Sequence, residues 1–183
     1  MATRENGYTF TTKENIQIVL GTNYISLPVT PINNLKAHDF CDLVENQDRS
    51  IGDIAKDPLN TYSCEQQSGT NFSMEIGEGY FVDGDSQIFL EIEGVSAPTV
   101  TLNLALDDNW VGIPQGINVT AASLCSKAGE PESEVEISYV NRWKSGGWVA
   151  YECNAPTPGD DFTLKPGVGY SVLVTSEGSL VLP

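Results

Sequence analysis

Four cysteines and a single histidine are the residues of this chain best suited to chemistry. A nucleophilic cysteine needs a base, and His38 precedes Cys41 by three residues on an expected helix. The corresponding positions of the second half hold Ala122 and Cys125, so this pair is not repeated. No two cysteines have the CxxC spacing that is typical of zinc ligands. The sequence therefore favours disulfides over a catalytic thiol or a metal site.

Carboxylates are the second group of candidates, because a pair held across a cleft hydrolyses glycosides and an oxygen-rich turn binds calcium. Asp83 and Asp85 are the candidate calcium ligands, although the full EF-hand pattern is missing. The other acidic clusters are Asp107 with Asp108, Asp160 with Asp161, and the run 130–136. All of them lie in expected turns and none recurs in both halves. Solvated loop charge is therefore the favoured interpretation, and no cofactor or other metal is predicted.

Aromatic side chains gather in the segment YVNRWKSGGWVAY, residues 139–151. The segment predicts a β-hairpin with the letters SGG at the turn and a tryptophan on either side. The candidate ligand-binding residues, which would form a platform for sugar rings, are Trp143, Trp148, Tyr139 and Arg142. The alternative is that the two tryptophans form a cross-strand pair that sets the register of the hairpin and covers the core.

The chain contains an internal duplication, with four ordered matches 84 to 90 residues apart. The matches are residues 23–28 with 109–114, the helix around Cys41 with the helix around Cys125, Cys64 with Cys153, and residues 77–80 with 167–170. Such a repeat indicates two copies of one supersecondary unit. We therefore predict two units, 1–94 and 95–183, packed together as one compact body.

Each unit is expected to hold one short helix with an apolar face. The residues with matching helical spacing are Ala37, Phe40, Cys41 and Val44 in the first copy and Ala121, Leu124, Cys125 and Ala128 in the second. The expected N-cap is Asn33 or Asn34 in the first copy and Thr120 in the second.

The duplication also selects among the three possible disulfide connectivities. Each unit has one cysteine on its helix and one on a strand, so the symmetric pairing is Cys41–Cys64 and Cys125–Cys153. Each bridge would close a loop of a little over 20 residues. In the chain-entropy model a loop of this length stabilises the fold by roughly 3 kcal/mol.

The rest of each unit has the pattern of β-strands. Alternating apolar residues predict an opening strand that runs on into residues 23–28 in the first copy and 109–114 in the second. The alternating residues are Ile16, Ile18 and Leu20 in the first copy and Val100, Leu102, Leu104 and Leu106 in the second. Glycines of the repeated GxGY turn are explained by their tolerance of positive φ, and no helix follows them as a phosphate loop requires. The predicted fold class is mainly β, with two tandem pseudo-symmetric units. Each is a small sandwich or partial barrel with one short helix held by a disulfide.

The charge excludes two classes of partner. The chain has 25 acidic and 9 basic residues and a net charge of −16. It lacks the cationic stripe that nucleic acids require, and anionic membrane surfaces would repel it. No apolar run approaches the roughly 18 residues of a membrane span, so membrane insertion is not expected.

The expected setting is extracellular, on a cell surface or on a virion surface, because disulfides persist in oxidising surroundings. The opening MATRENGYTF has no apolar segment of a signal peptide. Either a leader has been removed or the protein leaves its cell by another route, for example within a virion.

One whole unit combines NYISLP or NWVGIP, a short helix, RWKSGGWVAY and DFTLKPGVGY. This combination resembles a recurrent extracellular module of secreted and surface-anchored bacterial and archaeal proteins, which often occurs in tandem. The second unit fits best, whereas the first keeps YISLP and NFSMEIGEGYFV but lacks the tryptophan hairpin. The resemblance implies a surface β-module that serves attachment, assembly or ligand display, and it carries over no catalytic residues.

The predicted function is a non-enzymatic structural or interaction module on a cell surface, an extracellular filament or a virus particle, serving assembly, decoration or adhesion. The expected partner is another protein or further copies of the chain, because β-strand edges pair between molecules. The alternative is a carbohydrate-binding module that uses the Trp143/Trp148 hairpin. The least favoured alternative is a hydrolase built on the acidic loops.

Overall fold

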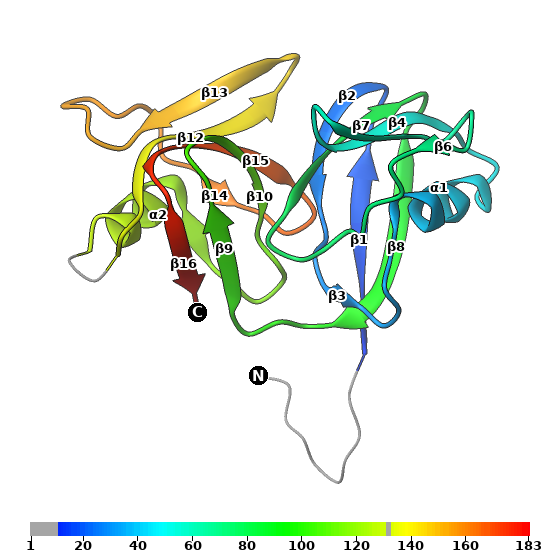
Figure 1. The fold of residues 1–183 in the computed structure, drawn as a ribbon, viewed down its shortest axis with the longest axis horizontal. Helices are drawn as coiled ribbons and strands as arrows, with labels where there is room; N and C mark the ends of the chain where they lie inside the picture. The colour runs from blue at the N-terminus through cyan, green and yellow to red at the C-terminus, as the bar shows by residue number, and fades with distance from the viewer. Residues whose placement is uncertain (1–10, 131–132) are drawn as a thin grey trace, which may run out of the picture.

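The computed structural model describes residues 11–130 and 133–183 (Figure 1). The opening segment on which the leader prediction rests, residues 1–10, lies outside this range, as do residues 131–132 of the acidic run 130–136. Within the described residues, no helix is long and apolar enough to cross a membrane.

The chain forms two β-rich units with one helix each. The first unit contains β1 (Thr12–Ile18), β2 (Gly21–Ser26), β3 (Thr30–Pro31), α1 (Ala37–Glu45), β4 (Ile51–Asp57), β5 (Asn60–Ser63), β6 (Ser68–Gly69), β7 (Gly79–Gly84) and β8 (Ile88–Val95). The second contains β9 (Val100–Leu104), β10 (Asp107–Gly112), β11 (Val119–Thr120), α2 (Ala121–Ala128), β12 (Glu136–Lys144), β13 (Gly147–Glu152), β14 (Thr163–Leu164), β15 (Gly169–Ser176) and β16 (Gly178–Leu182). The two helices lie at opposite outer ends of the molecule (Figure 1).

The sheets of the two units follow one antiparallel plan. The first unit has the sheets β2-β7-β4-β5-β6 and β1-β8-β3, and the second has β10-β15-β12-β13, β9-β16 and β11-β14. The order β2-β7-β4-β5 therefore matches β10-β15-β12-β13, and the pair β1-β8 matches β9-β16. The predicted fold class is confirmed.

Each unit has its own hydrophobic core under its helix. Phe40 of α1 and Tyr80 of β7 are fully buried in the first core, and Leu124 of α2 is fully buried in the second. Ile76 is half-buried and packs against both cores. The apolar helix faces predicted from spacing point inward, although Cys125 is only partly buried.

Both disulfides form as predicted. Cys41 of α1 bonds Cys64, and Cys125 of α2 bonds Cys153, so all four cysteines are used. Each bridge ties a helix to its own sheet, and neither crosses between the units. Two disulfides indicate an oxidising compartment.

The opening strands are shorter than their alternation predicts. β1 ends at Ile18 and β9 at Leu104, and the next residues of the pattern, Leu20 and Leu106, are 75% and 54% exposed. The chain turns here because the side-chain amide of the asparagine that follows binds the backbone. In the first copy Asn23 Oδ1 accepts from Val19 N at 2.9 Å and Nδ2 donates to Val19 O at 2.7 Å. Asn109 makes the same two bonds to Ala105.

The N-cap prediction is wrong for the first helix and right for the second. α1 begins at Ala37 with Lys36 as N-cap, and Lys36 N donates to Asp39 Oδ2 at 3.0 Å. The asparagines 33 and 34 lie in the preceding loop. Thr120 caps α2 as predicted, because its Oγ1 accepts from Ser123 N at 3.2 Å.

The tyrosine of each GxGY motif is buried and holds the preceding turn. Tyr80 Oη accepts a hydrogen bond from Glu75 N at 2.6 Å, and Tyr170 Oη accepts one from Lys165 N at 2.6 Å. Burial raises the pKa of both hydroxyls, and the charge of Glu78 raises the pKa of Tyr80 further.

These two hydroxyls should stay protonated at a pH at which exposed tyrosines ionise. Because their folded pKa lies above the unfolded value of about 10, their contribution to stability is intact below about pH 10 and is lost as the pH rises further. The free energy of unfolding should fall by about 1.4 kcal/mol per pH unit for each hydroxyl. Urea unfolding from neutral to alkaline pH measures this. A Tyr80→Phe, Tyr170→Phe variant should lose less stability over that range, and an equally steep fall would contradict the assignment.

Candidate functional site

The two units meet through matching backbone contacts. Ile25 of β2 forms a bridge with Val168, and the equivalent Val111 of β10 forms one with Glu78. Two hydrogen bonds also correspond: Ser26 N donates to Gly167 O at 3.4 Å, and Gly112 N donates to Gly77 O at 3.0 Å. Residues at equal positions of the two copies therefore exchange partners across the junction, as a pseudo-twofold axis requires.

The two glycines of each GxGY motif have different roles. Gly77 and Gly167 have φ values of 87° and 78°, which only glycine adopts without strain. Gly79 and Gly169 instead permit close approach by the other unit. A Cβ on Gly79 would lie 2.9 Å from Val111 N, and a Cβ on Gly169 would lie 2.7 Å from Ile25 O. Positive φ therefore explains only the first glycine of each motif, Gly77 or Gly167. The second glycine, Gly79 or Gly169, is required by the close packing of the two units.

An aromatic cluster spans this junction. Its members, named here the junction cluster, are Tyr24, Phe81, Trp110, Trp143 and Trp148. Tyr24 is central, and its ring centroid lies 4.5 Å from that of Trp148, 5.6 Å from that of Trp110 and 5.9 Å from that of Phe81. Tyr24 and Phe81 come from the first unit and the tryptophans from the second. The rings therefore join the two units.

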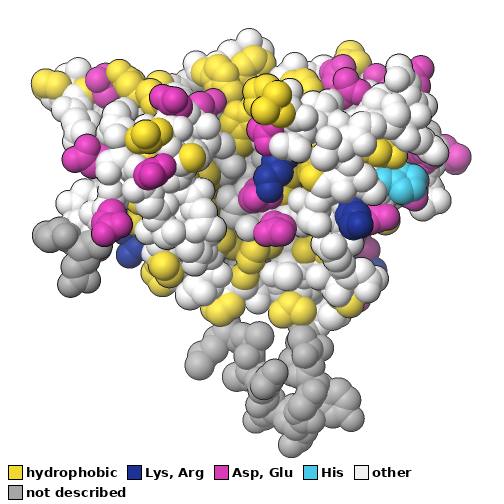
Figure 2. Space-filling model, viewed as in Figure 1, with side chains coloured by type: hydrophobic (Ala, Val, Ile, Leu, Met, Phe, Trp, Pro, Cys, Tyr) yellow, Lys and Arg dark blue, Asp and Glu magenta, His cyan; other side chains and the backbone are white. Residues whose placement is uncertain are grey.

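The cluster is accessible to solvent. Trp148 is 42% exposed, and the other four rings are half-buried. Figure 2 shows hydrophobic side chains gathered at the upper centre of the molecule, between its two halves. Aromatic rings that stay open to solvent are suited to contact a ligand or a partner.

The tryptophans are held by the predicted hairpin. Trp143 of β12 pairs directly with Trp148 of β13, and their centroids are 5.3 Å apart. Ser145 and Gly146 form the two-residue turn with φ values of 52° and 82°, as a type I′ turn requires. The predicted cross-strand pair exists, and it packs on Tyr24 of the other unit.

Strand alternation separates the other two candidate residues. Tyr139 lies on the face of β12 that carries Trp143, where a hydrogen bond from its hydroxyl to Glu152 and the charge of that carboxylate raise its pKa. Arg142 lies on the opposite face, and its guanidinium is 4.5 Å from the ring centroid of Phe162. The structure therefore brings Trp143 and Trp148 together, keeps Tyr139 on their face and places Arg142 elsewhere.

Polar side chains continue this surface beside Trp110. Ser171 Oγ donates to Asp108 Oδ1 at 2.6 Å, and Asn141 Nδ2 donates to Ser171 Oγ at 3.1 Å. Ser171 lies opposite both Trp110 and Asn141 in the sheet register. Burial raises the pKa of the Tyr24 hydroxyl, and the Asp108 carboxylate adds to this shift.

Two equivalent grooves flank the junction cluster. The first is a space of about 640 Å³ between β1, β2 and the tryptophan hairpin, and its lining includes Gln17, Thr22, Tyr24, Trp143 and Ser145. The second is about 520 Å³ between β9, β10 and the β4–β5 turn, and its lining includes Asn103, Asp108, Trp110, Lys56 and Glu78. Five positions of one groove match five of the other at an offset of 86 residues. The pairs are Gln17 with Asn103, Val19 with Ala105, Thr22 with Asp108, Asn23 with Asn109 and Tyr24 with Trp110. The first groove, however, is neutral and aromatic, whereas an ion pair between Lys56 and Glu78 lies in the second.

The remaining candidate residues are not members of the cluster. Asp83 and Asp85 line an acidic hollow beside the Cys41–Cys64 bridge. Across 11–130 and 133–183, however, no three His, Cys, Asp or Glu residues gather closely enough to hold a metal ion. His38 Nδ1 lies 3.2 Å from Tyr62 Oη, and Cys41 is oxidised in its disulfide. His38 and Cys41 therefore do not form a thiol–imidazole pair.

The sequence alone did not indicate three members of the cluster, namely Tyr24, Phe81 and Trp110. A signal exists for two of them, because Tyr24 and Trp110 occupy the same position in both copies of the N-aromatic motif. No family model, no curated protein sequence and no solved structure matches this chain. The resemblance to the tandem extracellular module therefore stays a prediction.

Proposed function

We propose that the chain is a non-enzymatic interaction module that works outside the cell, on a cell surface, an extracellular filament or a virus particle. The junction cluster is its contact surface, and another protein or a further copy of the chain is its partner. The carrying observation is that both units contribute aromatic rings to one solvent-accessible surface, at which Trp148 is 42% exposed. Exposed aromatic anchors contribute much of the binding energy at protein interfaces.

Two further observations support a non-enzymatic role. Both cysteines of each unit are used in disulfides, so they serve stability. The carboxylates beside the cluster are also engaged locally: Asp108 accepts from Ser171, and Glu78 pairs with Lys56. A hydrolase built on acidic loops is the least favoured alternative.

Carbohydrate binding is the second candidate function, and the neutral groove beside the hairpin favours it. Tyr24 and Trp143 offer flat apolar faces there, and Gln17, Thr22 and Ser145 offer neutral hydrogen-bonding groups. Apolar faces with a few polar groups are the usual lining of a small-molecule site.

The test is a Trp148→Ala variant compared with a matched Phe89→Ala variant. Phe89 lies on β8 outside the cluster, and at 58% exposure it is a similarly exposed aromatic residue. The measurements are glycan-array binding and self-association by sedimentation. Loss of an aromatic anchor should weaken at least one of the two more than tenfold in Trp148→Ala, and Phe89→Ala should retain both. Equal behaviour of the two variants would overturn the assignment of the contact surface. If the native chain binds no glycan on the array, the carbohydrate-binding hypothesis is wrong.

A further inference from the structure

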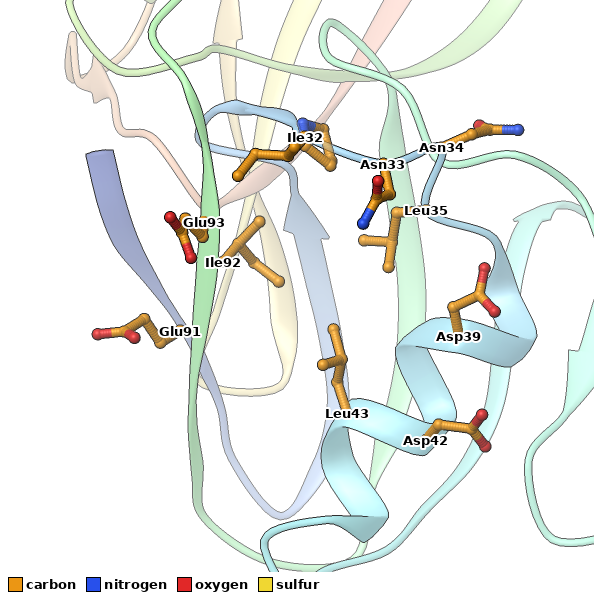
Figure 3. A pocket seen from close by; sticks show the side chains of 11 residues that line it. Ile32, Asn33, Asn34, Leu35, Asp39, Asp42, Leu43, Glu91, Ile92 and Glu93 are labelled. Carbon is orange, nitrogen blue, oxygen red and sulfur yellow. The ribbon is translucent and has the colours of Figure 1, made fainter. Parts of the chain in front are cut away.

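A second groove lies on the first unit, away from the junction. It holds about 630 Å³ between α1, β8 and the loop that follows β3. Figure 3 shows Leu35, Leu43 and Ile92 directed toward one another at its centre. Ile32 lies on the connecting loop and is 56% exposed. Leu35 and Ile92 are buried, at 9% and 3% exposure, so the accessible apolar surface of the groove comes from Ile32 and the partly buried Leu43.

One wall of this groove is an open strand edge. β8 pairs with β1 from Ile88 to Gly94 on one side, but on the other side β3 covers only Gly94 and Val95. Within the part of the chain that the structure describes, no backbone hydrogen bond reaches residues 88–93 from the groove side. An open edge of this kind is a template for another strand.

The rims of the groove are acidic. Asp39 and Asp42 stand on the helix side, and Glu91 and Glu93 project from β8 (Figure 3). Among the described residues that line the groove, none is Lys, Arg or His. Lys13 of β1 pairs with Glu91 at 2.7 Å, and His38 Nε2 lies 3.7 Å from Asp42 Oδ2. Among the residues that the structure describes, no basic side chain lies within ion-pair distance of the other two carboxylates, Asp39 and Glu93. A second copy of this chain, with a net charge of −16, would bring its own Glu91 and Glu93 to the edge, and like charges oppose that pairing.

We propose that this groove binds an extended segment of another protein that bears lysine or arginine at alternate positions. The segment adds to the open edge of β8 as a strand. Because side chains alternate along a strand, one set faces the accessible apolar surface at Leu43, and the other set faces Glu91 and Glu93 on the opposite side of β8. The site is independent of the junction cluster.

The probe is a fluorescently labelled octapeptide of alternating lysine and valine, and binding is followed by anisotropy. The native chain should bind this peptide and not its glutamate–valine counterpart. Neutralisation of the β8 rim by Glu91→Gln with Glu93→Gln should weaken binding roughly tenfold, because two charge contacts are lost. The matched control, Asp83→Asn with Asp85→Asn, removes equal charge from the acidic hollow elsewhere and should bind as the native chain does. Equal weakening in both double variants would show non-specific attraction and overturn the proposal.

Two further measurements test strand addition itself. A peptide with alternate backbone nitrogens methylated on its pairing edge should bind at least tenfold more weakly, because it cannot donate hydrogen bonds to β8. Equal affinity would overturn addition at this edge. Ile32→Ser, at an exposed position that does not affect the core, removes an apolar contact without adding charge and should also weaken binding of the lysine–valine peptide. Sedimentation of the native chain that showed dimers dissociated by Ile32→Ser would assign the groove to a second copy and overturn the proposal.

Discussion

Replacing Gly169 with alanine should destabilise the protein by about 3 kcal/mol, although the change adds a single methyl group. The added Cβ would lie 2.7 Å from Ile25 O and 3.0 Å from Ile25 N, and both atoms belong to the backbone of the other unit. Backbone on both sides cannot rotate away, so the two units must separate or shift. Overpacking of this kind typically costs about 1 to 3 kcal/mol, and a contact between two backbones lies at the upper end. Gly79→Ala should have a similar effect, because its Cβ would meet Val111 N at 2.9 Å.

The hairpin supplies the control for this prediction. A Cβ on Gly147 meets no heavy atom within 4 Å, so Gly147→Ala should change stability by less than about 1 kcal/mol. The measurement is urea unfolding followed by tryptophan fluorescence, which reports on the junction because all three tryptophans belong to the junction cluster. Equal stability of Gly169→Ala and Gly147→Ala would contradict the close packing of the two units.

The duplication explains why so much of the fold could be predicted from the sequence. A repeated cysteine pattern selected Cys41–Cys64 and Cys125–Cys153, whereas four cysteines without a repeat would have left three connectivities open. Apolar spacing located both helices, and turn residues located the hairpin. The opening strands were predicted too long because a polar side chain redirects the backbone: the Asn23 amide turns the chain before Leu20 can enter the strand.

The junction cluster could not be predicted because it depends on how the units pack against each other. Tyr24 meets Trp143 and Trp148 although more than a hundred residues separate them in the chain. No local pattern encodes a contact of that kind. The position of Arg142 was predictable: it lies two residues after the buried Val140 on one strand, and strict alternation places both on the same face.

The two disulfides should contribute unequally, although their loops are similar. Their sequence separations are 23 and 28 residues, and loops of this length stabilise by about 3 kcal/mol in the chain-entropy model. Cys41 and Cys64 are only 2% and 3% exposed, whereas Cys125 and Cys153 are partly buried at the edge of the second core. Replacing both cysteines of the first bridge by alanine therefore also removes buried sulfur atoms from a packed core.

We expect the Cys41→Ala, Cys64→Ala variant to lose about 4 to 5 kcal/mol of unfolding free energy and the Cys125→Ala, Cys153→Ala variant to lose about 3 kcal/mol. The difference reflects the buried core volume that the first substitution empties, since chain entropy slightly favours the longer second loop. Urea unfolding followed by circular dichroism, with both variants oxidised, measures the two losses. A larger loss for the second bridge would mean that loop entropy dominates, and no loss for either would contradict the role of the bridges in holding each helix on its sheet.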